Sequence, residues 1–353
     1  METMSINLKD ESTIVDSRDY KSLYKGKRVL VAGGTGVIGI PTVERLCEFG
    51  ADVSVVSMDS PEYAAAVLPK AVSFKKLDLT VLENCLSATK EQEFVFNLVG
   101  IKGSTGIGET KVASYLVPML WYQTNLMEAA FRNKATRFLF VSSICGYPFS
   151  EIDKVEDTFW DGLPKQNDRI PGLAKRIGEV QGEAYLKEYG WDAVRIVRPS
   201  NVYGPYDDFN PQTAQVVPSL IRRVLDGENP MVVWGDGSAR RDFIYSHDVA
   251  ESILRILYDG PVCDPLNLGS GTGVTIRELA QTIIETLSPK TEIIWDTQKP
   301  SGDSVRVLSM DKTESLLGKL PLTPLTVGIR QTADWFLKNQ SILIQKSQRH
   351  YPR

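Results

Sequence analysis

Short apolar runs alternate with longer segments of mixed polarity through the first half of the chain. Near-continuous apolar runs of this kind predict strands that are buried on both faces of a sheet. They lie at 29–32, 53–56, 72–74, 94–99, 138–141 and 193–197. Helix-like periodicity separates them, for example at 123–133 and 173–189. The alternation predicts an α/β protein with a Rossmann-like, doubly wound parallel sheet.

A glycine-rich segment follows the first of these strands and precedes a helix-like stretch that ends near Phe49. Its candidate binding residues are Gly33, Thr35, Gly36, Val37, Ile38 and Gly39. Glycines let the backbone approach a pyrophosphate, and the N–H groups and dipole of the following helix favour its charge. Together with the strand at 53–56 the segment completes a βαβ unit, which predicts a dinucleotide site.

The end of the second strand indicates which dinucleotide binds. Folds that prefer NAD usually place an acid there, whereas an Arg accommodates the 2′-phosphate of NADP. Ser57 occupies this position, Asp59 lies nearby, and no Arg or Lys occurs between 52 and 69. We therefore expect NAD, with NADP as the alternative. Asp78 and Leu79 could contact the adenine, although this pair could equally cap a helix.

The regular alternation of strand-like and helix-like segments ends after Pro199, where Pro, Gly and Asn cluster. We expect a smaller, discontinuous C-terminal substrate lobe that closes over the carboxyl edge of the sheet. The predicted parts are a mobile N-terminal arm at 1–25, a dinucleotide-binding domain at 26–200 and 240–287, a substrate-binding lobe at 201–239 and 288–340, and a tail at 341–353.

Composition narrows the class of partner. The 353 residues carry a net charge of −4 with both signs interleaved, so no basic stripe predicts nucleic-acid binding. Four scattered Cys and two His lack metal-ligand spacing, which predicts neither a metal site nor a disulfide framework. No apolar run approaches the roughly 20 residues that span a bilayer. We expect no membrane contact and a cytoplasmic location.

The first candidate catalytic residues follow the strand at 138–141. Ser143 could hydrogen-bond a sugar hydroxyl or carbonyl, and Cys145 could act as an acid or base if its pKa is perturbed. Both could instead be ordinary buried residues at a strand end. Further along, Pro171 suits the first turn of a helix that carries Lys175 one turn later.

The order of these motifs resembles the extended short-chain dehydrogenase/reductases, also called the NAD-dependent epimerase/dehydratase family. The resemblance spans about 27–339 and includes the following motifs: Gly33–Gly39, Asn125, Ser143, Lys175 with Gly178-Glu179, Arg198–Pro205, Arg241–Tyr245, Asn267–Gly271 and Arg306. It implies a nicotinamide cofactor and a nucleotide-sugar substrate. The segments at 203–211 and 334–337 are most similar to family members that epimerise and reduce a GDP-linked sugar.

The resemblance also implies roles for single residues. Lys175 would hold the nicotinamide ribose, and Asn125 and Pro199 would contact the cofactor. The sugar and diphosphate would be bound by Asn201, Arg223, Arg241 and Arg306, since the planar guanidinium suits a diphosphate. Surface ion pairs are the alternative role for each arginine.

Two positions depart from the family pattern. Pro171 stands where the family has the Tyr that exchanges a proton with the sugar oxygen, and Pro has no titratable group. Gln215 stands where a His partners the Cys during epimerisation. Tyr147 is the tyrosine nearest to Ser143 in sequence and is a candidate replacement acid. His247 is expected to be structural.

Three functions follow from this pattern. The first is an NAD(P)-dependent epimerase/reductase that interconverts hydroxyl and ketone on a nucleotide-sugar, favouring a GDP-sugar, with Ser143, Cys145 or Tyr147 handling the proton. The second is a catalytically silent relative that acts as a sensor or partner subunit. The third is a nucleotide-sugar dehydratase, which would need another proton acceptor. We expect a homodimer through helices near 119–133 and 173–189.

Overall fold

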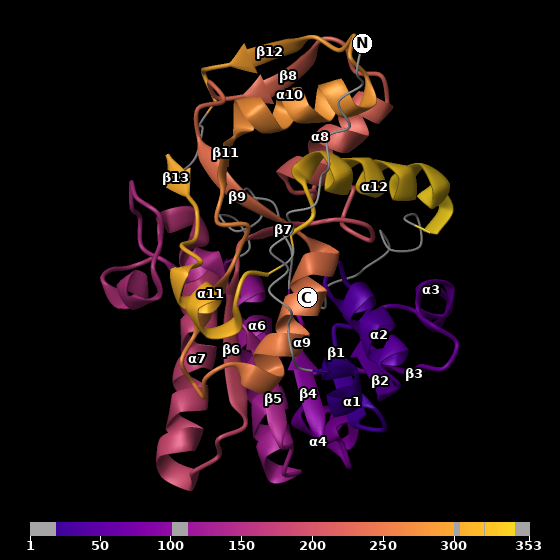
Figure 1. The fold of residues 1–353 in the computed structure, drawn as a ribbon, viewed down its shortest axis with the longest axis vertical. Helices are drawn as coiled ribbons and strands as arrows, with labels where there is room; N and C mark the ends of the chain where they lie inside the picture. The colour runs from indigo at the N-terminus through magenta and orange to yellow at the C-terminus, as the bar shows by residue number, and fades with distance from the viewer. Residues whose placement is uncertain (1–18, 101–111, 300–303, 321, 343–353) are drawn as a thin grey trace, which may run out of the picture.

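A seven-stranded parallel sheet dominates the computed structural model, which describes residues 19–100, 112–299, 304–320 and 322–342. Its strand order is β10-β6-β5-β4-β1-β2-β3 (Figure 1). The strands are β1 (Arg28–Ala32), β2 (Asp52–Ser57), β3 (Ser73–Lys76), β4 (Phe94–Asn97), β5 (Arg137–Val141), β6 (Val194–Pro199) and β10 (Leu266–Leu268). This order and the parallel pairing confirm the predicted Rossmann-like α/β fold.

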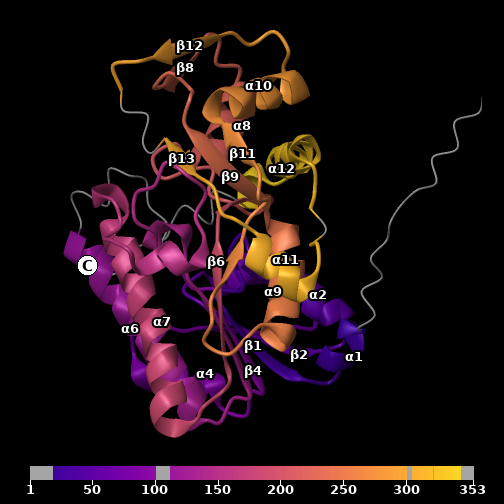
Figure 2. The ribbon, with the colours of Figure 1, turned by 60° about the vertical axis from the view of Figure 1, so that its left-hand side comes forward.

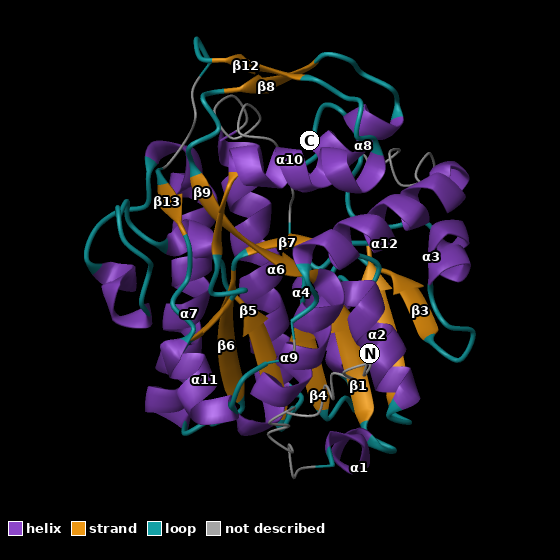
Figure 3. Ribbon diagram, turned by 45° about the horizontal axis from the view of Figure 1, so that its top comes forward, coloured by secondary structure: helices purple, strands orange, loops and turns teal. Residues whose placement is uncertain are grey.

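Helices cover both faces of this sheet (Figures 2 and 3). One face carries α2 (Gly39–Glu48) and α9 (Ser246–Asp259), and the other carries α4 (Leu82–Thr89), α6 (Val112–Arg132) and α7 (Arg169–Tyr189). Successive side chains of a strand point to opposite faces, so Val29 and Val31 pack toward α2 and α9 while Leu30 packs toward α4 and α6. Burial on both faces accounts for the continuous apolar runs.

A smaller lobe lies at one end of the molecule (Figure 1). Its strands are β7 (Asn201–Tyr203), β8 (Met231–Trp234), β9 (Arg240–Tyr245), β11 (Gly273–Thr275), β12 (Ile293–Asp296) and β13 (Val305–Arg306), and its helices are α8 (Val216–Leu225), α10 (Ile276–Leu287) and α12 (Leu325–Lys338). β9 pairs with β7, β11 and β13, and β8 pairs with β12. The helices and β9 share a separate apolar core. β7 follows β6 directly, so the lobe begins at the carboxyl edge of the main sheet.

Short elements complete the described chain. They are α1 (Tyr20–Tyr24), α3 (Pro61–Val67), α11 (Asp311–Leu317) and the 3-10 turns η1 (Ile144–Gly146), η2 (Glu156–Trp160) and η3 (Gln166–Asp168).

The structure corrects three of the expected boundaries. α10 was expected in the dinucleotide-binding part, but Leu279 and Ile283 place it in the core of the lobe. α11 was expected in the lobe, yet it packs against β10 and α9. Residues 19–25 were expected in a mobile arm, whereas Tyr24 is fully buried and its ring contacts Phe49 and Phe94. Periodicity predicts that a helix has an apolar face but does not say which core buries it.

The ends of the chain fall largely outside the described residues. This applies to 1–18 of the expected arm and to 343–353 of the expected tail. Ile342, which was also assigned to the tail, packs beside a small cluster that contains Ile40 and Tyr63. At least this part of the tail therefore belongs to the folded protein.

Candidate functional site

The glycine loop between β1 and α2 is built from close backbone contacts. Gly33 has φ +80°, and a Cβ there would lie 2.9 Å from the carbonyl carbon of Leu98. A Cβ on Gly39 would lie 2.3 Å from the Gly33 oxygen, so α2 can begin this close to the turn only with glycine. Gly36 differs, because its Cβ would meet nothing nearer than the Gly33 oxygen at 3.4 Å. The loop is therefore tight within itself and open at Gly36.

The strand beside this loop ends in a buried donor. Asn97 closes β4, and its Nδ2 has no hydrogen-bond partner among the described residues. Leu98, the next residue, is the one that approaches Gly33. A buried amide without a partner is costly unless a ligand or water supplies an acceptor. The open Gly36 and the unpaired Asn97 amide therefore fit a bound phosphate-containing cofactor.

A carboxylate is fixed at the end of β2. The Thr35 hydroxyl donates to Asp59 Oδ2 at 2.5 Å, and the Asp59 amide donates to the Ser57 hydroxyl at 3.1 Å. These bonds hold Asp59, which is buried, next to the glycine loop. A carboxylate here would repel the 2′-phosphate of NADP.

The expected adenine-binding residues belong to one connected turn. The Asp78 carboxylate accepts hydrogen bonds from the amide and hydroxyl of Thr80, and Leu79 is buried. Asn125 on α6 donates from Nδ2 to the Thr80 carbonyl at 2.9 Å. The N-cap of α4 is Val81, so Asp78 does not cap this helix. Contact of these residues with a cofactor remains a prediction.

Ser143, Cys145 and Lys175 come together at the carboxyl end of β5. The Cys145 amide donates to the Ser143 hydroxyl at 3.1 Å. Lys175 on α7 donates from Nζ to the Val141 carbonyl at 2.7 Å. A Cβ on Gly172 would lie 2.3 Å from the Cys145 oxygen, so the first turn of α7 packs directly on the Cys145 backbone. Pro171 lies in that same turn, and Pro199 ends the neighbouring strand β6.

Burial controls the charge of Lys175. The loss of solvent around its ammonium lowers the pKa to about 8, although the Cys145 and Glu179 charges act in the opposite direction. The ammonium also lies 5.2 Å from the centre of the Phe140 ring. Lys175 is therefore charged at neutral pH but much closer to losing its proton than a solvated lysine.

Arg306 brings the lobe into contact with the end of β5. Its Nη2 lies 2.8 Å from Cys145 Sγ, and its Nη1 forms an ion pair with Asp168 Oδ2 at 3.0 Å. Burial raises the pKa of the Cys145 thiol, Arg306 lowers it, and Asp168 raises it. No sequence motif marks Asp168. An acid three residues before Pro171, at the start of a predicted helix, was the available signal.

Two of the predicted substrate arginines lie side by side. Arg306 on β13 is in register with Arg241 on β9, and paired residues of parallel strands point to the same face. Asn201 on β7 donates to the Asp242 carbonyl at 2.8 Å. Arg223 lies elsewhere in the lobe, where it forms hydrogen bonds with Glu228 and the Val232 carbonyl. The structure thus gathers Asn201, Arg241 and Arg306 around β9 and does not link Arg223 to them.

Tyr147, the candidate replacement acid, is part of a buried network. Its hydroxyl donates to Asn267 Oδ1 at 2.7 Å and accepts from Arg198 Nη1 at 3.1 Å. Its side chain is 3% exposed, and burial raises its pKa to about 12. This environment favours a structural role over proton transfer to a substrate.

The other residues singled out in the sequence lie in structural surroundings. His247 stacks on Tyr245 with ring centres 5.0 Å apart, and burial lowers its pKa. Gln215 is the N-cap residue of α8 in the lobe and makes no side-chain capping bond.

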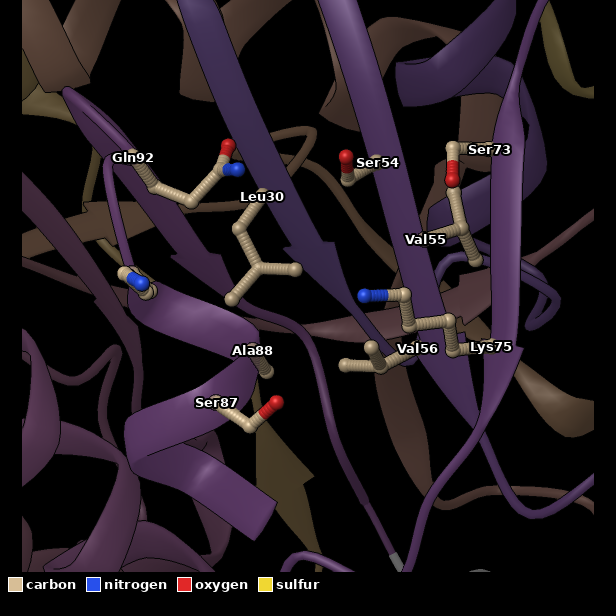
Figure 4. A pocket seen from close by; sticks show the side chains of 10 residues that line it. Leu30, Ser54, Val55, Val56, Ser73, Lys75, Ser87, Ala88 and Gln92 are labelled. Atoms are coloured by element: carbon tan, nitrogen blue, oxygen red, sulfur yellow. The ribbon is translucent and has the colours of Figure 1, made fainter.

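A cavity of about 70 Å³ lies between α4 and the strands β1 to β3 (Figure 4). It is lined by Leu30, Ser54, Val55, Val56, Ser73, Lys75, Ser87, Ala88, Lys90 and Gln92. None of the predicted site residues is among them, so this cavity is separate from the carboxyl edge.

Over the described ranges, no group of three or more Cys, His, Asp or Glu side chains could hold a metal ion. No described helix has the length and apolarity to cross a membrane.

The glycine loop, the parallel sheet, and Ser143 and Lys175 near its carboxyl edge define a dinucleotide-binding protein of the short-chain dehydrogenase/reductase type. The profile of the NAD dependent epimerase/dehydratase family matches residues 29–269, and the chain belongs to that family. This confirms the resemblance seen in the sequence and implies a nicotinamide cofactor.

Individual relatives cover nearly the whole chain. GDP-L-fucose synthase 1 of Arabidopsis thaliana is 31% identical over 89% of this chain and 94% of its own. The UDP-glucose 4-epimerase of Thermus thermophilus, solved in complex with NAD, has a TM-score of 0.74 at 27% identity, covering 88% of this chain and 99% of its own. An epimerase from Methanothermobacter thermautotrophicus has a TM-score of 0.81 at 24% identity, covering 92% and 96%, and supports the fold alone.

Proposed function

We propose that the protein is an NAD-dependent epimerase/reductase that interconverts a hydroxyl and a ketone on a nucleoside-diphosphate sugar. The observation that carries this proposal is the position of Arg306. It pairs in register with Arg241 and contacts Cys145, so the two arginines that would bind a diphosphate lie next to the group of Ser143, Cys145 and Lys175. Two adjacent guanidinium groups suit a diphosphate.

A GDP-sugar is the substrate that we favour. The segments at 203–211 and 334–337 are similar to GDP-sugar enzymes, and the Arabidopsis relative is named a GDP-L-fucose synthase. The Thermus relative is named a UDP-glucose 4-epimerase, so the nucleotide base is the property that needs a direct test. Asn201 and Arg223 remain proposed substrate contacts.

The cofactor would bind along the glycine loop, from Gly33 to Gly39. When bound, a nicotinamide supplies or accepts the hydride of the reaction. Lys175 would hold the nicotinamide ribose, with Asn125 and Pro199 as further contacts. Asp59, fixed by Thr35, supports NAD over NADP.

The two other functions have less support. A silent sensor or partner subunit would not need the contact between Arg306 and Cys145 or the buried bond from Lys175 to the Val141 carbonyl. A dehydratase needs a proton acceptor at the carbon next to the ketone, and the segment at 174–178 supplies no acid.

We further propose a homodimer through α6 and α7, which lie side by side (Figure 2). These helices expose apolar side chains, among them Trp121 at 55%, Ile177 at 52% and Val180 at 43%. Exposed apolar side chains on adjacent helices suit a protein interface. Sedimentation at several protein concentrations tests the dimer.

The cytoplasmic location expected from the sequence stays a prediction that cell fractionation would test.

The function is tested with the purified protein and its retained ligands. Mass spectrometry of these ligands should identify NAD. Addition of GDP-, UDP- and dTDP-sugars should change the absorbance band of the reduced nicotinamide, with the largest change for a GDP-sugar. Measurable binding without turnover of any of these sugars would contradict the proposal.

A further inference from the structure

We propose that Cys145, Asp168 and Arg306 form the proton-transfer centre of this enzyme, in place of a tyrosine at position 171. The Cys145 thiol exchanges a proton with the sugar oxygen, and Asp168 exchanges that proton with solvent. Arg306 holds the two groups together. The inference rests on the proposed oxidation and reduction of a nucleotide-sugar.

The three side chains converge from distant parts of the chain. Cys145 lies in η1 after β5, Asp168 ends η3 before α7, and Arg306 comes from β13 of the lobe. Arg306 Nη1 lies 3.0 Å from Asp168 Oδ2, and Nη2 lies 3.4 Å from Oδ1 and 2.8 Å from Cys145 Sγ. One planar guanidinium therefore binds both carboxylate oxygens and the sulfur.

The centre lies where the acid of this fold is needed. The Cys145 carbonyl packs against Gly172, so the first turn of α7 lies directly beside the cysteine. Pro171 belongs to that turn, and Lys175 follows it on the same helix. The side chains of Asp168 and Arg306 are 23% and 17% exposed, and Cys145 is partly exposed. Asp168 and Arg306 therefore connect the buried thiol to the surface of the site.

The surrounding charges suit an acid that must release a proton and take it back. Arg306 from β13 and Lys175 from α7 are the cations that act on the thiol, Asp168 is the anion, and Ser143 accepts a bond from its backbone. Burial and Asp168 favour the neutral thiol before reaction. The two cations stabilise the thiolate once the proton has left.

The proton balance closes without any further reactant. In the direction of reduction, the carbonyl carbon receives the hydride that the proposed function supplies. The S–H bond of Cys145 breaks, an O–H bond forms on the sugar oxygen, and the electron pair of the broken bond stays on sulfur. The thiolate then regains a proton from water through the Asp168 carboxylate. In the direction of oxidation, the thiolate takes the hydroxyl proton and Asp168 passes it to water.

The contact between these groups also limits what the centre can do. Because the thiol and the carboxylate bind the same guanidinium, both lie on one side of a bound sugar. They can serve one oxygen, but they cannot act as an acid and a base on opposite faces of a carbon. Inversion by proton removal at a carbon next to the ketone would therefore need an additional residue.

The first test measures the thiol itself and needs no turnover. Alkylation of Cys145 by iodoacetamide is followed by mass spectrometry across pH, with the partly exposed Cys47 as the internal reference. Asp168→Asn should move the Cys145 profile to lower pH and raise its alkylation rate at neutral pH severalfold, because loss of the carboxylate lowers the thiol pKa. Arg306→Gln should move the profile to higher pH.

The matched control is Asp161→Asn, which removes an exposed acid from the same connecting segment. Its Cys145 profile should match the wild-type profile. Equal profiles for Asp168→Asn and Asp161→Asn, with normal thermal unfolding of both, would overturn the inference.

The second test measures turnover of the nucleotide-sugar. Cys145→Ser and Asp168→Asn should lower kcat by about 10² to 10⁴-fold, as expected for loss of a general acid. Sugar-nucleotide binding by Cys145→Ser should stay near the wild-type value. Asp168→Glu should recover part of the lost rate, and its pH–rate profile should differ from that of the wild type.

The outcomes separate this inference from the proposed function. Absence of turnover by the wild type, with the alkylation profiles of Asp168→Asn and Arg306→Gln shifted as expected, would refute the proposed function while the coupling of Cys145 to Asp168 and Arg306 stands. A wild type that turns over the sugar together with a Cys145→Ser variant of unchanged kcat would refute the proton-transfer centre alone.

Discussion

Arg198 on β6 donates two hydrogen bonds to the buried Glu179 carboxylate on α7, from Nε at 3.0 Å and from Nη2 at 2.7 Å. The Ser142 hydroxyl, at the end of β5, donates to the same carboxylate. Glu179 lies one helical turn after Lys175 on the same helix face. This ion pair therefore fixes α7 against the sheet edge and positions the lysine at the candidate site.

Glu179→Gln should destabilise the protein and weaken cofactor binding. Replacement of the carboxylate leaves the Arg198 guanidinium buried without its counter-charge, which costs about 3 kcal/mol of unfolding free energy. Urea denaturation would measure this loss. Glu188→Gln, an exposed substitution on the same helix, should leave the unfolding free energy unchanged. Equal stability of the two variants would show that the ion pair does not fix α7.

Alanine at two glycines of the loop should have different effects. Gly36→Ala places a methyl group where the folded chain has space, so the thermal midpoint should stay near the wild-type value while NAD binding weakens by at least about tenfold. Gly39→Ala forces its Cβ against the Gly33 carbonyl and should lower the midpoint itself. Calorimetric titration and thermal unfolding would separate the two effects. Undiminished NAD binding by Gly36→Ala would place the pyrophosphate elsewhere.

NAD affinity should fall as the pH rises through about 8. The Lys175 ammonium has its pKa lowered to about 8 by burial, so the positive charge that would bind the cofactor is lost above that pH. Fluorescence titration of NAD across pH would show the decrease, and Lys175→Met should bind weakly at every pH. A pH-independent affinity in the wild type would mean that this ammonium does not contribute.

The same lowering of the Lys175 pKa predicts that the stability of the cofactor-free protein rises with pH, whereas NAD affinity falls. Between pH 8 and 10.5 the unfolded chain keeps the Lys175 proton that the folded chain releases. Stability rises with pH wherever the unfolded state binds more protons, so this contribution increases across that window. Comparison of wild type with Lys175→Met by urea denaturation isolates the contribution.

Tyr147→Phe should lower stability and leave kcat near the wild-type value. The change removes the donor to Asn267 and the acceptor for Arg198, which costs about 1 to 3 kcal/mol for buried partners left unpaired. Tyr189→Phe, at an exposed position, serves as the control. Loss of kcat by the order expected for a general acid would instead assign the proton to Tyr147.

Pro171→Tyr should raise turnover of a GDP-linked keto-sugar. The new phenol lies four residues before Lys175 on the same helix face, where a general acid contributes up to about 10² to 10⁴-fold. Pro171→Phe, which adds the ring without the hydroxyl, should not raise the rate. An unchanged or lower rate in Pro171→Tyr would contradict this expectation and would mean that a phenol at this position adds nothing to proton transfer by Cys145.

The sequence predicted the sheet because its strands are local features. Each strand of the dinucleotide-binding half is buried on both faces, so it is a continuous apolar run whichever helix covers it. The glycine loop was equally visible, since Gly33 and Gly39 are needed for contacts with residues close by in sequence or on the adjacent strand. Tyr24 was missed because a five-residue helix shows too little periodicity to predict burial.

The candidate site was only partly visible from the sequence. Ser143, Cys145 and Lys175 follow elements whose positions the fold class dictates, so family motifs could mark them. Asp168 and Arg306 are 138 residues apart, and nothing local to either predicts their ion pair. The pair exists because β13 aligns beside β9 and thereby carries Arg306 from the lobe to the end of β5.

The sequence by itself determined the parallel sheet, the dinucleotide loop and the absence of a tyrosine at position 171, because each depends on residue type and local pattern. Only the tertiary structure decided which core receives α10 and α11, and which groups surround the Cys145 thiol. These depend on the packing of segments that are distant in the chain, which local periodicity does not encode.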